Sequence, residues 1–200
     1  MMDAGKARRG FTLLELVVVV AILMVVAAMA TPAVITTVND YKLRTAAGNI
    51  GSVIQKTRMQ AVSDDRWYPV HMGAAAGRSY AFSDLNNNFA LDDNEKNLVA
   101  YLPRGINFDG AGGPSLASMN LDFTPAIGLP AYNARGLPCM PAAGGATCPL
   151  QTAAGGAQGW SGYIFYLRQD RALGGPAWAA ITVSAAGRVR TWTWNGNAWN

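Results

Sequence analysis

The chain is poor in the residues that carry most enzymatic and metal chemistry. Its 200 residues include one histidine and two cysteines, and charged residues make up 14% of the sequence. No serine or cysteine has an evident base to activate it, and no phosphate-binding loop is present. We therefore expect no catalytic set, and the composition predicts a protein that is not an enzyme.

Charge is also missing from a long stretch near the N-terminus, where no charged residue lies between Glu15 and Asp40. As a helix, residues 11–30 would span roughly 30 Å, the thickness of a hydrocarbon layer. The basic residues that stay cytoplasmic when such a helix is inserted precede it: Lys6, Arg8 and Arg9. The sequence predicts one membrane span over about residues 11–35, with the rest of the chain on the other side of the membrane.

Glu15 is the exception inside this apolar run. A carboxylate carried into lipid costs several kcal/mol unless it finds a partner, and such residues are usually functional. Cleavage after Gly10 would give Phe11 a free α-amino group one helical turn from Glu15, where the helix dipole also favours an acid. Processing would then supply the missing partner.

The segment Gly10-Phe11-Thr12-Leu13-Leu14-Glu15 resembles the signature of type IV prepilins: a short basic leader, Gly, Phe, and Glu at the fifth mature position. This resemblance implies cleavage by prepilin peptidase between Gly10 and Phe11 and methylation of the new N-terminus. It also implies that Glu15 guides docking into a filament by pairing with a neighbouring subunit. Pro32 fits the kink-forming proline of pilin helices.

Two other interpretations of the N-terminus remain open. Residues 16–27 have the length of a secretory h-region, and Ala28-Met29-Ala30 fits its cleavage pattern. A plain membrane anchor with an incidental glutamate is the second. Either would remove the assembly role of Glu15.

The rest of the chain predicts an α+β fold of the type IV pilin kind, with a long N-terminal helix packed on an antiparallel β-sheet domain. We expect a leader over 1–10, a helix over 11–64 and a β domain over 65–200. Gly48 and Gly51 predict a bend in the helix or close packing against a sheet. Short runs rich in aromatic and β-branched residues predict strands over 67–72, 78–83, 97–102, 106–109, 120–124, 163–168, 178–184 and 188–194.

Two of these segments, Asn120–Gly128 and Ile181–Arg190, resemble the paired sheet motifs of the GspH/FimT family of minor pilins and pseudopilins. The resemblance implies a structural subunit of a type IV pilus or a type II secretion pseudopilus, near the filament tip. It implies a bacterial inner-membrane location with a periplasmic C-terminal domain. The implied partners are other pilins or pseudopilins and prepilin peptidase, and no small-molecule substrate.

Cys139 and Cys148 lie among prolines in a loop rich in Gly and Ala. In an oxidising compartment such a pair predicts a disulfide. A metal pair or a redox pair does not fit, because His71 is distant in sequence and the spacing is not C-x-x-C.

Residues 84–95 repeat the oxygen-ligand spacing of a twelve-residue calcium loop. The ligand positions hold Asp84, Asn86, Asn88, Asp92 and Glu95. Phe89 departs from the pattern, because that position normally holds glycine in a left-handed conformation. Strands also replace the expected flanking helices. An Asx-rich turn whose side chains bond their own backbone is the alternative to calcium binding.

Positive charge is concentrated near the C-terminus, where five arginines and one acid follow residue 130. Arg188 and Arg190 alternate along a predicted strand and share a face with Trp192 and Trp194. Arginine binds phosphate and aromatic rings stack on bases, so this face, with Arg168 and Arg171, predicts a DNA site. Gly187-Arg188-Val189-Arg190 resembles the motif associated with DNA binding during natural transformation in FimT-like minor pilins. Solvated arginines beside core tryptophans are the alternative.

Overall fold

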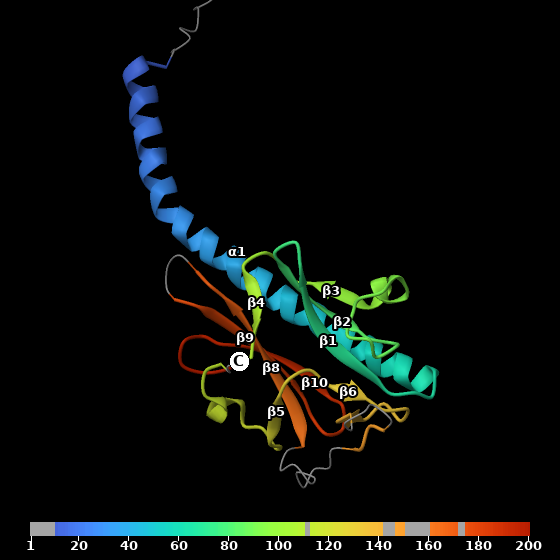
Figure 1. Cartoon of the computed structure of the whole chain (residues 1–200). Coiled ribbons are helices and arrows are strands. Elements are labelled where there is room, and N and C mark those ends of the chain that lie inside the picture. Colours follow the sequence, from blue (N-terminus) through green and yellow to red (C-terminus); the bar gives the residue numbers. More distant parts are fainter. Residues whose placement is uncertain (1–10, 111–112, 142–146, 151–160, 172–174) are drawn as a thin grey trace, which may run out of the picture. The chain divides into compact units, whose positions relative to one another are not determined.

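The structure is a computed structural model that describes residues 11–110, 113–141, 147–150, 161–171 and 175–200. In this part of the chain, one long helix precedes ten short strands and two 3-10 helices (Figure 1). The chain divides into two compact units, Met1–Asp40 and Tyr41–Asn200. The predicted α+β fold, a long apolar helix packed against antiparallel sheets, is confirmed.

Helix α1 (Leu13–Ser63) runs through both units. Its first part contains Pro32, which cannot donate a backbone hydrogen bond. The side chains of Thr31 and Thr37 donate to the carbonyls of Ala27 and Ala33, at 2.7 and 2.9 Å. In the described part of the chain, α1 is the helix that is long and apolar enough to cross a membrane.

The second part of α1, within the unit Tyr41–Asn200, buries one face. The buried positions recur every three or four residues, as expected for one helix face: Leu43, Ala46, Ala47, Ile50, Gly51, Val53, Ile54, Thr57 and Ala61. Gly51 packs against the sheet, because a Cβ there would lie 3.8 Å from Val189 Cγ1, an ordinary van der Waals contact. The prediction of close packing is thus confirmed at Gly51, and the helix continues through it.

The first sheet has the strand order β3-β2-β1-β6-β7 and is antiparallel throughout. Its strands are β1 (Tyr68–Ala75), β2 (Arg78–Ser83), β3 (Val99–Tyr101), β6 (Ala131–Tyr132) and β7 (Pro138–Cys139). The 3-10 helix η1 (Asp93–Leu98) leads into β3. The loop between β2 and η1 contains four of the predicted calcium ligands, and the fifth, Glu95, lies in η1.

The second sheet has the order β10-β9-β8-β4, and β5 pairs with β8 in parallel. Its strands are β4 (Ile106–Asp109), β5 (Pro125–Ile127), β8 (Gly162–Gln169), β9 (Ala177–Val183) and β10 (Val189–Thr193). Alternate residues of β8 and β9, such as Phe165 and Ile181, join the core cluster that includes the buried face of α1. Strands β8 and β9 are buried on both faces, so something else must cover the second face.

That outer face of β8, β9 and β10 carries a second apolar cluster. Its buried members are Met119, Ile164, Tyr166, Ala180 and Trp199, and the half-buried Trp178, Trp192 and Trp194 pack against them. The 3-10 helix η2 (Leu116–Met119) and the C-terminal residues close over this side. The Trp199 indole donates to the carbonyl of Ser115 at 3.0 Å.

The strand predicted over 120–124 is wrong. Ser115 caps the start of η2 by accepting a hydrogen bond from the backbone amide of Ala117 (3.4 Å). Asn120, the residue that follows η2, has a φ of 46°. Asparagine tolerates this left-handed backbone, so the chain turns here instead of extending. The strand begins later, at Pro125, because residues 125–127 are the ones that pair with residues 162–164 of β8.

Candidate functional site

Phe11 lies two residues before α1, and Glu15 lies in the first turn of this helix. Thr12 caps the helix, because its hydroxyl accepts the backbone amide of Glu15 at 3.2 Å and its carbonyl accepts Leu16 N at 3.2 Å. Phe11 is 81% exposed, and Glu15 is also exposed. Gly10, the other predicted processing residue, lies outside the described residues.

The carboxylate of Glu15 has no hydrogen bond or ion pair within the described residues. Around it, the side chains of α1 are apolar and exposed on every side of the helix through Val26. A helix that is apolar all round needs an apolar environment, either lipid or other helices. In that environment the carboxylate needs a cation that this part of the chain does not supply.

The predicted arginine face is only partly assembled. Arg190 lies on β10, exposed, with its guanidinium carbon 5.4 Å from the centre of the Trp192 ring. The Trp192 indole donates to Thr182 Oγ1 at 2.9 Å, so this ring is held in the sheet. Arg188 is exposed and precedes β10, in the turn after β9, where its amide donates to Ser184 Oγ at 3.2 Å.

Arg168 lies on the same sheet but carries acidic partners. Its guanidinium lies 2.9 Å from Asp170 Oδ1 and 3.6 Å from Asp109 Oδ2, and 5.7 Å from the centre of the Trp178 ring. Strand register puts it two strands and four residues away from the position of Arg190, a distance of roughly 16 Å. The two carboxylates therefore largely neutralise the charge of Arg168. Arg171 follows β8 and is next to Asp170 in sequence.

Arg58 of α1 holds the turn that precedes Arg188, a role that the sequence analysis missed. Its guanidinium donates to the carbonyl of Gly187 at 3.2 Å. Gly187 has a φ of +77°, and a Cβ there would lie 3.1 Å from the Arg58 guanidinium carbon, so this position favours glycine. The sequence analysis did not place Arg58 near the core, although its helical spacing from Ile54 and Ala61 is a signal that could have done so.

The disulfide between Cys139 and Cys148 is confirmed, with a Cα–Cα distance of 5.3 Å. Cys139 lies buried on β7, and its carbonyl accepts the hydroxyl of Tyr163 at 2.5 Å. Burial raises the pKa of the Tyr163 hydroxyl, so it remains a donor at neutral pH. The bridge thus ties its loop to a strand that is itself bonded to the second sheet.

The loop 84–95 folds around its own carboxylates. Asp84, fully buried, accepts the backbone amides of Asn86, Asn88 and Phe89 at 2.9 to 3.3 Å. Glu95, also fully buried, accepts those of Leu85 and Asp92 at 2.7 and 3.0 Å.

Across the same loop, Asp92 Oδ2 receives the side-chain amides of Asn86 and Asn88 at 2.6 and 2.7 Å. The self-bonded Asx turn is therefore what the structure contains. In the described residues, no group of three or more His, Cys, Asp or Glu is arranged to hold a metal.

Two details of the loop bear on calcium. Phe89 adopts the left-handed backbone (φ 62°) that the calcium pattern requires at its position. The expectation of strands on both sides is wrong, because Glu95 lies in η1 and forms a capping box with Asp92. Calcium binding by Asp84, Asn86, Asn88, Asp92 and Glu95 stays a prediction.

That prediction can be checked by thermal unfolding of residues 41–200 with and without calcium. A ligand present at a hundred times its Kd stabilises the folded state by about 2.7 kcal/mol, which corresponds to a rise in Tm of roughly 5–10 °C for a domain of this size. Asp92→Asn should reduce the rise, and magnesium should give a smaller one. An unchanged Tm would leave the loop as an Asx turn.

The comparisons with known proteins agree with the N-terminal geometry. A family model described as the prokaryotic N-terminal methylation motif matches residues 5–31. No curated protein and no solved structure matches the chain. The match covers residues 5–10 of the predicted leader, the candidate cleavage point, Glu15 and most of the exposed apolar helix, and it leaves the β domain unassigned.

Proposed function

We propose that the mature protein is a minor pilin or pseudopilin of the GspH/FimT type. The premise is its N-terminal methylation motif, which indicates a type IV pilin-like substrate of prepilin peptidase. It serves as a structural subunit of a type IV pilus or a type II secretion pseudopilus and performs no catalysis. Before assembly it lies in the bacterial inner membrane with Tyr41–Asn200 in the periplasm. The three basic residues ahead of the span support this orientation.

The exposed carboxylate of Glu15, which lies in the first turn of α1 and has no partner in the described residues, carries the proposal. A free amine at Phe11 of a neighbouring subunit would neutralise it inside a bundle of apolar helices. The helix then exchanges lipid for other helices, while its exposed apolar surface stays out of water. The charge pair fixes the axial register between subunits, because a buried charge tolerates few positions.

We expect mass spectrometry of the native protein to find Phe11 at the mature N-terminus, with a methylated amine. Cleavage after Gly10 removes the basic leader and creates the charge that Glu15 lacks. A strain without prepilin peptidase is the control and should retain the unprocessed chain. A mature protein beginning at Thr31 would instead identify an ordinary secretory signal and overturn the proposal.

A second candidate function is DNA binding by a FimT-like minor pilin, for uptake during natural transformation. The observations that favour it are the two exposed arginines, Arg188 and Arg190, and the ring of Trp192 beside Arg190. The turn that carries Arg188 is held by Arg58, so this cation is presented on a fixed backbone. Arg168 contributes less, since two carboxylates already neutralise it.

We expect Arg188→Gln with Arg190→Gln to weaken binding of residues 41–200 to duplex DNA. Removing two phosphate contacts should flatten the slope of log affinity against log salt by about 1.8 units. Fluorescence anisotropy measures this slope, and circular dichroism checks folding. Lys56→Gln with Arg104→Gln removes the same charge from exposed positions elsewhere and should leave the slope nearly unchanged. Equal slopes for both pairs would reduce the arginine face to a solvated strand.

A further inference from the structure

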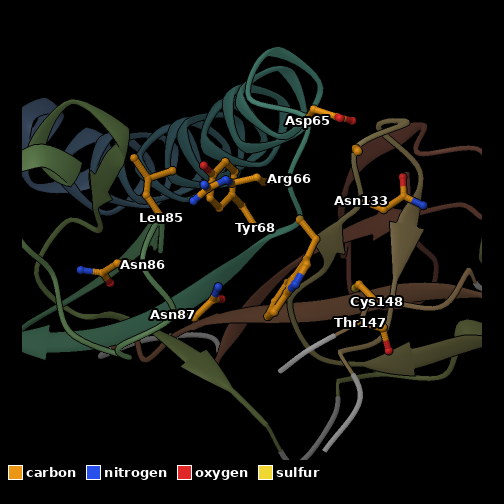
Figure 2. Close-up of a pocket in the computed structure, with 11 residues that line it drawn as sticks. Asp65, Arg66, Tyr68, Leu85, Asn86, Asn87, Asn133, Thr147 and Cys148 are labelled. Carbon is orange, nitrogen blue, oxygen red and sulfur yellow. The ribbon is translucent and has the colours of Figure 1, made fainter. Parts of the chain in front are cut away.

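A pocket of about 720 Å³ opens beyond the C-terminal end of α1, within the unit Tyr41–Asn200. Four separate parts of the chain line it: the segment 65–68 after the helix, the segment 85–87 after β2, and the pairs 133–134 and 147–148 (Figure 2). Its volume lies in the range of pockets that hold small ligands. Neither the N-terminal motif nor the arginine face involves it.

The polar side chains around this pocket are mostly free. Asp65, Arg66, Asn87 and Thr147 make no hydrogen bond or ion pair through their side chains in the part of the chain that the structure describes. Asn133 uses its carbonyl oxygen for the amides of Arg135 and Leu137, at 2.9 and 3.1 Å, which leaves its NH2 group as a donor. Most donors and acceptors around this cavity therefore have no hydrogen-bond partner among the described residues, although Arg66 attracts the carboxylate of Asp64 and Asn86 donates to Asp92.

Trp67 adds an aromatic surface to the same lining. It is half-buried, and its indole N–H has no partner among the described residues. An indole ring offers an apolar face to a ligand together with one hydrogen-bond donor at its edge. Tyr68 next to it is committed to the fold, because its hydroxyl donates to Asp64 at 3.0 Å.

The charges and hydrogen-bonding groups of the lining indicate which class of ligand fits the pocket. A phosphate or carboxylate ligand needs several cations, whereas this lining offers Arg66 and sets the acidic Asp65 beside it. A fully apolar ligand would strip water from the amides without replacing their hydrogen bonds. A neutral ligand with many hydroxyl groups and flat C–H faces satisfies both the ring and the amides.

We propose that this pocket binds a neutral oligosaccharide, with the Trp67 ring against a sugar face and Arg66, Asn87, Asn133 and Thr147 bonded to hydroxyls. Asn87 has a φ of 57°, and asparagine tolerates this left-handed backbone. The proposal does not rest on processing, assembly or DNA binding.

The test uses the full processed chain in micelles of an amine-oxide detergent, which has no sugar head group. Cellotetraose and chitotetraose are the probes, and calorimetry together with saturation-transfer NMR reports binding. At least one probe should bind, with an affinity that does not fall as salt is raised. Absence of binding by both probes, or a steep loss with salt, overturns the proposal.

Substitutions of residues that line the pocket test whether the oligosaccharide binds there. Trp67→Ala should weaken affinity at least about tenfold and Trp67→Phe much less. Asn87→Gly removes the amide while keeping a residue that favours positive φ, so it tests the site even if Trp67→Ala fails to fold. Tyr101→Ala, an exposed aromatic residue away from the pocket, is the matched control. Unchanged affinity in Asn87→Gly and in any folded Trp67→Ala would place the ligand elsewhere and overturn the assignment.

Discussion

Glu15→Ala should leave the precursor membrane-inserted and cleavable yet remove it from filaments. Insertion becomes easier, because the one charge in the apolar stretch is gone. Assembly loses the partner of the Phe11 amine. An unpaired charge left in apolar surroundings costs about 3–5 kcal/mol, so incorporation at equilibrium should fall by at least about a hundredfold.

Copurification with the other filament subunits measures this loss, and mass spectrometry confirms that cleavage still occurs. Glu15→Gln separates charge from shape, since it keeps the size of the side chain and should fail like Glu15→Ala. Val19→Ala, one turn further along the same exposed helix, is the matched control and should assemble. Normal incorporation of both Glu15 variants would show that the carboxylate has no part in docking.

Ile54→Ala should produce a large loss of stability. Ile54 is fully buried and belongs to the core cluster that joins α1 to both sheets. Deleting three buried carbons and leaving a cavity costs about 2–5 kcal/mol. The Tm of residues 41–200, which contain this whole cluster, should fall by roughly 4–20 °C.

Met59→Ala is the control for this variant, because Met59 lies on the same helix and is 71% exposed. Its Tm should change by no more than a few degrees. Chemical denaturation of both variants should give the same dependence on denaturant with different midpoints. A fall for Met59→Ala as large as that for Ile54→Ala would contradict the burial pattern of α1.

The sequence predicted well where a feature depends on neighbouring residues. The apolar run after Phe11 predicts a helix, and the recurrence of small and branched residues from Leu43 to Ala61 identifies its buried face. The aromatic and β-branched residues of β8 and β9 predict strands. The disulfide could be predicted from two cysteines nine residues apart in a chain expected in an oxidising compartment.

The sequence predicted poorly where distant segments meet. The sequence predicts that Trp192 and Trp194 share a stacking surface with the arginines. In the structure, Trp192 packs against a cluster that η2 and Trp199 cover. The same closure explains the misplaced strand, because residues 116–121 supply apolar cover for the sheet instead of pairing within it. No sequence pattern predicted the pocket near Trp67, because its lining residues come from segments up to about eighty residues apart.

The contact between α1 and the last strands sets the order in which this domain can be completed. The apolar stripe of the helix is made early, while β8, β9 and β10, which cover part of it, end at Thr193. At synthesis rates of roughly 5–20 residues per second, on the order of ten seconds separate the two. During that interval the nascent chain carries uncovered apolar surface, so chains that stop before residue 162 should be substrates for chaperones and proteases.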